Sequence, residues 1–256
     1  MKKIIIAATT IAGLSAPAYA ELEGDLSLTY SSQFNYRGVN DILQDATRNL
    51  GVGNVTDDTF EAALNLSWKL DDNWSLVGGV NINSISDASV DHDRFRFGVR
   101  YTTECYYVEV GYQRQELEFL PIANGFDTGE IYLKAGTEVL GVDVSLHVAH
   151  DVDLLEGTYV ELSGRKDWAV SEQASIGLTV GVSYSFDYWE NIIGTGSSLN
   201  HAYATLSFDY KATDNLTLSP FVTFSQGFNA LEASGFGVSI EEDDELTFGL
   251  SASVSF

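Results

Sequence analysis

The chain has 256 residues, of which 13 are basic and 37 acidic, and its formal net charge is −24. A charge of this sign and size repels the phosphates of nucleic acids, which excludes nucleic-acid binding as a function. The hydrophobic fraction of 45% is ordinary for a folded chain, yet no stretch after residue 20 has the eighteen successive apolar residues of a membrane-spanning helix.

The first twenty residues predict a secretory signal peptide. They begin with Lys2 and Lys3, continue with an apolar stretch over residues 4–14 and end in the small-residue site Ala18-Tyr19-Ala20. We therefore expect the mature chain to start at Glu21 and residues 21–256 to form a single domain. The only cysteine is Cys105, so neither a lipid anchor at the cleavage site nor an internal disulfide is expected.

The rest of the chain alternates apolar and polar side chains in about twelve segments. Period-two alternation indicates β-strands with one apolar face, and about 9–11 residues suffice for a tilted strand to cross a bilayer. In chain order, the apolar sides span residues 26–36, 60–68, 76–82, 95–101, 106–112, 131–135, 142–148, 160–162, 176–184, 202–210, 216–224 and 246–256. This pattern predicts an all-β fold, a transmembrane up-and-down antiparallel β-barrel of about twelve strands.

The connections support this prediction because short turns alternate with longer polar loops. The expected turns are residues 71–73, 102–104, 138–141, 167–173 and 212–215. Bacterial outer-membrane barrels have short periplasmic turns and long external loops in this alternation. Trp68, Trp74 and Trp168 flank the short turns, where an interfacial aromatic belt belongs. Pro220 lacks a backbone donor and predicts a bulge or kink in its strand.

The last predicted strand is apolar at every second position from Leu246 to Phe256. We expect it to close the barrel against residues 26–36, since a barrel has no edges only when its first and last strands pair. The terminal Phe256 is the expected signal for the barrel assembly machinery. The expected location is the bacterial outer membrane, in contact with its lipid and lipopolysaccharide. A secreted β-sandwich or lipocalin-like barrel is the alternative, but such a fold buries its apolar face and exposes charge.

The face opposite the apolar one is expected to line the pore. It carries seven basic and seven acidic residues: Arg37, Lys69, Arg94, Arg96, Arg100, Lys134, Arg165, Glu61, Glu109, Glu130, Asp143, Glu161, Asp209 and Glu245. Glycines at positions 79, 98, 111, 177, 181 and 249 are expected to leave interior volume unfilled. Side chains fill the lumen of an eight-stranded barrel and sixteen strands leave an aqueous channel, so about twelve predict a narrow water-filled path.

The inward charges have two interpretations. Arg94, Arg96 and Arg100 point inward from one strand, and the turn after Thr102 should place Glu109 roughly opposite Gly98. One interpretation is a cationic ladder that faces carboxylates and orders small polar solutes. The other is a set of salt bridges that only brace the wall.

The long loops are strongly acidic. We expect a mouth that includes Asp57, Asp58, Glu241, Glu242, Asp243 and Asp244 and that concentrates cations at low ionic strength. Carboxylates at 241–244 could hold calcium or magnesium, but the spacing of a calcium-binding loop is absent. A solvated charge run is the preferred interpretation, and we predict no metal site and no cofactor.

An outer-membrane hydrolase is the alternative from another class. Asp91-His92-Asp93 and the segment 150–153 place acids beside imidazoles at expected loop ends, whereas His147 and His201 should point into the lumen. No serine lies in a recognisable nucleophile motif. We therefore predict no enzymatic activity and no catalytic residues.

The chain as a whole resembles bacterial outer-membrane porin-like β-barrels. The local sequence Tyr36-Arg37-Gly38-Val39 is similar to the early segment of the TorF-type porin family. The resemblance implies a small channel and no catalytic residues. The predicted function is passive diffusion of small hydrophilic solutes with a mild cation preference. A non-channel surface barrel for adhesion or envelope stability is the alternative.

Overall fold

The computed structural model describes residues 21–33, 37, 58–85, 90–119, 126–229, 231, 233–235, 238–240 and 244–256. The predicted signal peptide therefore lies outside the described residues, as do Asp57, Glu241, Glu242 and Asp243. Within the described ranges no helix is long and apolar enough to span a membrane.

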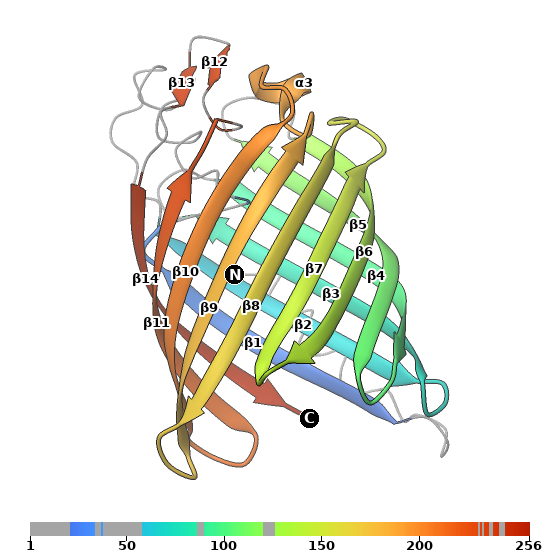
Figure 1. Ribbon diagram of the computed structural model, residues 1–256, viewed down its shortest axis with the longest axis vertical. Helices are drawn as coiled ribbons and strands as arrows, with labels where there is room; N and C mark the ends of the chain where they lie inside the picture. Colours follow the sequence, from blue (N-terminus) through green and yellow to red (C-terminus); the bar gives the residue numbers. More distant parts are fainter. Residues whose placement is uncertain are drawn as a thin grey trace.

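Twelve strands form one closed barrel in which each strand pairs antiparallel with its neighbour in the chain (Figure 1). This confirms the predicted up-and-down fold. The strands are β1 (Leu22–Ser31), β2 (Thr59–Lys69), β3 (Trp74–Ile85), β4 (Val90–Thr102), β5 (Tyr106–Phe119), β6 (Phe126–Val139), β7 (Val142–Asp151), β8 (Thr158–Ala169), β9 (Ala174–Phe186), β10 (Ser198–Lys211), β11 (Leu216–Gly227) and β14 (Asp244–Ser255). A small hairpin of β12 (Ala233–Gly235) and β13 (Val238–Ile240) lies at the same end as the one-turn helix α3 (Glu190–Ile193).

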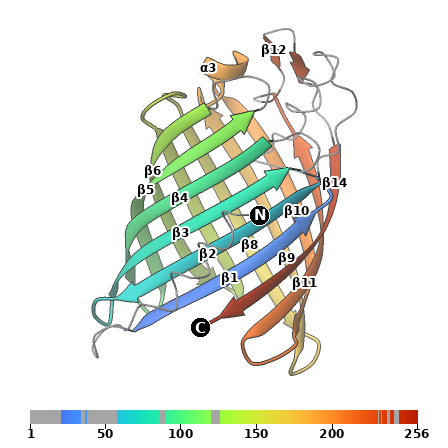
Figure 2. The same ribbon diagram turned by 180° about the vertical axis from the view of Figure 1, so that it is seen from behind.

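The terminal strand closes the barrel as predicted. Figure 2 shows β14 beside β1, and the register places Leu26 opposite Val254 and Tyr30 opposite Leu250. Beyond the last pair of strand residues, Gly24 N–H donates to the Phe256 carbonyl at 2.9 Å and Phe256 N–H donates back at 3.0 Å. The Phe256 ring covers Gly24 so closely that a Cβ there would lie 2.7 Å from a ring carbon.

The outer surface of the barrel is apolar and the interior is polar. Leu28, Phe60 and Phe97 are 56%, 59% and 66% exposed, whereas Glu109 and Glu130 have no exposed surface. A soluble protein hides its apolar face and exposes its charges, so this distribution argues against the lipocalin-like alternative. It matches a barrel whose outer band faces lipid.

The short turns gather at the end of the barrel opposite α3 (Figure 1). Leu140 and Gly141 both have positive φ, 55° and 74°, as a two-residue hairpin turn requires. Trp68, Trp74 and Trp168 are exposed beside these turns, which supports the predicted aromatic belt. Two turns are shorter than predicted, because β6 continues to Val139 and β8 to Ala169, which leaves only residues 140–141 and 170–173 outside the strands.

The bulge predicted at Pro220 is not there. Pro220 stays in register opposite Leu250 of β14, while the pairing with β10 is interrupted at this level, because proline has no N–H to donate. The register shift lies instead in β10, between Leu199 and Ala202. This bulge lets the successive residues Asn200 and His201 both be buried on the inner side.

The prediction that the inner-face glycines leave empty space is wrong. Each is covered by a large side chain from a strand one or two places away in the barrel: Gly79 by Arg96, Gly98 and Gly111 by Tyr132, Gly177 by Arg165, Gly181 by Tyr203 and Gly249 by Phe221. At Gly111, for example, a Cβ would lie 2.6 Å from the Tyr132 ring. The glycines therefore make room for rings and guanidinium groups that lie flat on the wall.

Candidate functional site

The barrel encloses a cavity of about 520 Å³. Its walls are mainly polar or charged: Arg37, Asn65, Asn81, Arg94, Arg96, Gln113, Lys134, His147, Tyr159, Glu161, His201, Tyr203, Thr205, Thr223 and Ser225. A smaller cavity of about 190 Å³ shares Thr223 and is lined by further polar groups, among them Glu61, Asn83 and Thr247. The two cavities are therefore neighbours in the lumen, and His147 and His201 point inward as predicted.

A buried ion pair between Arg37 and Glu130 lies at the centre of the lumen network. Arg37 donates from Nη1 and Nη2 to the two oxygens of Glu130 at 2.6 and 2.9 Å. The guanidinium carbon lies 4.4 Å from the centre of the Tyr159 ring and 4.6 Å from that of Tyr188. Asn200 Nδ2 donates to the Arg37 carbonyl at 2.7 Å. Arg37 therefore satisfies its charge by a bidentate bond and two cation–π contacts.

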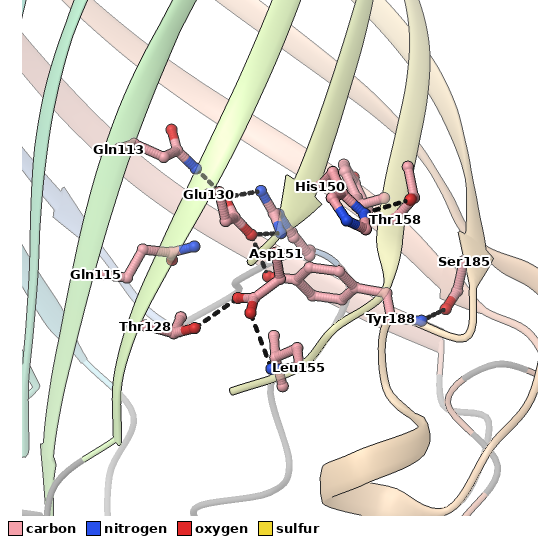
Figure 3. A network of polar contacts seen from close by, with 12 residues as sticks. Gln113, Gln115, Thr128, Glu130, His150, Asp151, Leu155, Thr158, Ser185 and Tyr188 are labelled. Atoms are coloured by element: carbon pink, nitrogen blue, oxygen red, sulfur yellow. Dashed lines mark hydrogen bonds and ion pairs between the residues drawn. The ribbon is translucent and has the colours of Figure 1, made fainter. Parts of the chain in front are cut away.

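Glu130 also accepts hydrogen bonds from Gln113 and from the Tyr188 hydroxyl, so its charge is well satisfied although it is fully buried. Figure 3 shows Gln113, Glu130 and Tyr188 converging from β5, β6 and the connection between β9 and β10. Beside them, Asp151 accepts from Thr128 Oγ1 at 2.6 Å and from the Leu155 backbone N–H at 2.9 Å. The buried Asp151 thus stabilises the connection between β7 and β8 by hydrogen bonds.

The ion pair also joins opposite sides of the barrel. Arg37 follows β1 by six residues, whereas Glu130 lies on β6 and Tyr159 on β8. In the closed order of strands, β6 and β8 flank the strand that is farthest from β1. Arg37 therefore lies across the lumen from β1 and narrows the lumen there.

Five of the seven predicted pore-lining bases form ion pairs with carboxylates. The closest distances are Arg37–Glu130 2.6 Å, Lys69–Glu23 2.6 Å, Arg94–Glu61 2.9 Å, Arg100–Glu109 2.6 Å and Arg165–Asp167 2.6 Å, with Asp209 at 2.7 Å from Arg165 as well. For these residues the bracing interpretation is supported. Within the described residues, Arg96 and Lys134 form no ion pair with a carboxylate.

The sequence prediction of one lumen surface is correct only in part. Arg37, Arg94, Arg96, Lys134 and Glu161 line the larger cavity, and Glu61 lines the smaller one. The others line neither cavity. Lys69, Asp143, Arg165 and Asp209 lie toward the short turns, Arg100 and Glu109 pair with each other, and Glu130 and Glu245 are buried on the inner side of the barrel.

The predicted cationic ladder needs two corrections. Glu109 lies opposite Arg100 rather than Gly98, because Thr102 pairs with Tyr107 at the turn and Gly98 faces Gly111. Arg94 is paired with Glu61 from β2, so of the three arginines only Arg96 is without a carboxylate partner in the described chain.

Several lumen residues were missed from the sequence. Tyr132, Tyr159 and Tyr188 are almost fully buried inside, although tyrosine also occurs on the outer belt. Tyr132 stands between Ile131 and Leu133, which both point outward, so the alternation itself marked it as an inward residue. Tyr188 and Asn200 depend on the loop after β9 and on the β10 bulge, for which the sequence had no clear signal.

Among the side chains that the structure describes, the predicted Asp–His clusters do not form a hydrolase site. His92 is buried with Nε2 3.2 Å from Gln115 Oε1, and His150 Nδ1 lies 3.0 Å from Thr158 Oγ1. A serine–histidine contact does exist elsewhere, with Ser183 Oγ 2.6 Å from His201 Nδ1. Asn200 Nδ2 lies 3.0 Å from the same ring nitrogen, whereas in a catalytic triad the nucleophile and the orienting group bond different nitrogens. This contact is therefore part of the buried network around Asn200.

Of the six predicted mouth acids, the structure describes two. Asp58 precedes β2 and is half-buried, and Asp244 begins β14 and is exposed. Both lie at the end of the barrel away from the short turns, because β2 runs from Thr59 toward the turn at 70–73 and β14 runs toward Phe256.

Comparison with protein-family models and with curated protein sequences gave no match. Solved outer-membrane barrels do match in structure. Outer membrane phospholipase A from Escherichia coli has 12% identity and a TM-score of 0.52, with 97% of this chain and 96% of that chain covered. A NanC porin has 11% identity and a TM-score of 0.50, with 90% and 98% covered. A KdgM porin has 12% identity and a TM-score of 0.49, with 91% and 99% covered.

The chain thus has the fold of bacterial outer-membrane porin-like barrels, as its sequence predicted. At these identities the likeness shows the fold alone. An enzyme and porins share that fold, so function depends on the interior of the barrel. The TorF-type resemblance stays a prediction from the sequence.

Proposed function

We propose that this protein is an outer-membrane channel through which small hydrophilic solutes diffuse passively. The observation that carries the proposal is the polar cavity of about 520 Å³ inside a closed barrel, with a second polar cavity beside it. A water molecule takes about 30 Å³ in the liquid, so a cavity of this size and polarity accommodates several waters and a small solute. The apolar outer band and the predicted signal peptide support the outer membrane as its location.

The lining residues favour diffusion over catalysis. They include arginines, a lysine, a glutamate, amides, hydroxyls and imidazoles spread over strands on several sides of the lumen. Among these described lining residues no hydroxyl is hydrogen-bonded to a histidine, and the contact of His201 with Ser183, which does not line the cavity, lacks the geometry of a triad. We therefore expect no catalytic activity.

A mild cation preference at low ionic strength is part of the proposal, and it depends on the acidic loops. Exposed carboxylates such as Asp244 attract cations over about 10 Å at 0.1 M salt and much less at higher salt. The preference is therefore a property of the mouth rather than of the cavity.

A non-channel barrel for adhesion or envelope stability is the second candidate, and one observation favours it. Arg37 crosses the lumen and is fixed there by Glu130, Tyr159, Tyr188 and Asn200. The ion pairs of four other bases along the wall, Lys69, Arg94, Arg100 and Arg165, would likewise brace a closed barrel. In a non-channel barrel the cavities would hold water but would not connect the two ends of the barrel for solutes.

Liposome swelling with a graded series of neutral sugars separates the two candidates. A channel lets small sugars enter and excludes larger ones, because Arg37 narrows the lumen. The control is liposomes that contain the same amount of heat-unfolded protein. If liposomes with folded protein swell with none of the sugars, the result would favour the non-channel candidate.

A further inference from the structure

Of the seven predicted pore-lining bases, Arg96 and Lys134 have no carboxylate partner among the described residues, whereas the other five have one. Arg96 on β4 donates from Nη2 to Asn65 Oδ1 at 2.6 Å, and its buried Nε has no hydrogen-bond partner. Lys134 on β6 lies with Nζ 5.5 Å from the centre of the Tyr132 ring and donates no side-chain hydrogen bond within the described residues. Both side chains line the larger cavity.

The carboxylates near these cations are already engaged. Glu109 accepts from Arg100 at 2.6 Å and from the Tyr132 hydroxyl at 2.8 Å. Glu130 is held by Arg37. Glu161, the one acid that lines the larger cavity, accepts from the hydroxyls of Tyr159 and Tyr203 at 2.6 and 3.2 Å. These carboxylates are therefore already held by donors other than Arg96 and Lys134.

The two cations also act on each other. Arg96 and Lys134 are both half-buried and line the same cavity, from β4 and β6. Two like charges beside one cavity repel, and both lose hydration relative to bulk water. An anion in the cavity relieves both costs, because it restores a charge-assisted hydrogen bond to each cation.

We propose that Arg96 and Lys134 form a binding station for small anionic solutes, with carboxylates as the chemical class, inside a protein whose net charge is −24. The inference rests on the proposed channel function and adds its solute class. The acidic mouth then favours cations, whereas the lumen favours anions. The mouth acts through exposed charges that salt screens, whereas the station acts through confined charges that salt screens much less.

The test is the reversal potential of the folded protein in a planar bilayer under a potassium chloride gradient near 1 M, where the Debye length is about 3 Å. We expect wild type to be anion-selective under these conditions. The double variant Arg96→Gln/Lys134→Gln should lose that selectivity. The charge-conserving variant Arg96→Lys/Lys134→Arg should keep it, which controls for repacking of the lumen.

A second measurement uses no conductance, so it separates this inference from the proposed function. Glutarate, compared with sodium chloride of equal ionic strength, should raise the temperature at which wild type loses its folded, heat-modifiable migration, because binding to the native state stabilises it. The Gln double variant should show no such difference. Cation-selective wild type at high salt, or a Gln variant with unchanged selectivity, would overturn the station in a conducting protein. If wild type does not conduct, absence of the glutarate effect would overturn it, and its presence would support a station in a barrel that is not a channel.

Discussion

Arg37 and Glu130 form a buried, bidentate ion pair that joins the chain after β1 to the far wall of the barrel, with 6% of one side chain and none of the other exposed. The contact crosses the lumen, so it bears on both stability and permeation.

Removal of Arg37 should destabilise the barrel and widen the lumen. In Arg37→Ala, Glu130 is left as a buried charge without its cation, which typically costs about 3–5 kcal/mol. We expect the variant to lose its folded, heat-modifiable migration at a lower temperature than wild type. We also expect a larger single-channel conductance. The matched variant Arg37→Gln/Glu130→Gln removes both charges and should recover much of the stability. Equal unfolding temperatures of Arg37→Ala and wild type would contradict the assigned role.

The orientation of the barrel can be tested with the natural thiol. Cys105 is exposed in the short turn after β4, which we place in the periplasm. A membrane-impermeant thiol reagent should label it only after the outer membrane is permeabilised. In a Cys105→Ser background, cysteines placed at Asp58 or Asp244 should label in intact cells, and cysteines at Asp71 or Asp214 should not. The reverse pattern would invert the topology.

The contact of Phe256 with Gly24 predicts that barrel closure is sensitive at both positions. Gly24→Val brings side-chain atoms into the Phe256 ring, since even a Cβ would lie 2.7 Å from it. Phe256→Asp removes the ring and places a charge in the outer band beside the first strand. Both variants should accumulate several-fold less folded protein, whereas Ser255→Ala at the neighbouring exposed position should not. Normal heat-modifiable migration of Phe256→Asp would show that the terminal aromatic is dispensable for assembly.

Neutralisation of Glu241, Glu242, Asp243 and Asp244 to Gln or Asn should reduce cation preference at low salt and change little near 1 M salt, because exposed charges are screened there. Reversal potentials at both ionic strengths measure this. If the variant changed the reversal potential equally at low and high salt, the effect of these carboxylates would not be that of exposed, screened charges. The lumen variants described above should change selectivity at both ionic strengths, because confined charges are screened much less.

Sequence periodicity was sufficient to predict the barrel, its closure by Phe256 and the inward direction of most charged residues. Period-two alternation determines which face of a strand each side chain occupies. The alternation of short turns and long loops indicates which connections lie at the same end of the barrel. Periodicity could not predict which charges meet. Arg94 pairs with Glu61 across β3, and Arg37 reaches Glu130 across the lumen, so neither partner follows from the neighbouring strand.

The glycines show a second limit of the sequence. Small residues on the inner face suggested open space, but Tyr132 lies over Gly98 and Gly111 and fills it. Likewise, Asn200 and His201 are both buried inside because β10 shifts register at this point, which a strict period of two does not anticipate. The width of the lumen thus depends on side chains that lie along the wall and on a bulge.

Whether the barrel conducts can be measured by single-channel recording in planar bilayers. Purified wild-type protein, shown to be folded by heat-modifiable migration, should insert with discrete conductance steps, and Arg37→Ala should give larger ones. Folded protein that gives no steps above the background of the lipid, in wild type and in Arg37→Ala alike, would contradict the channel.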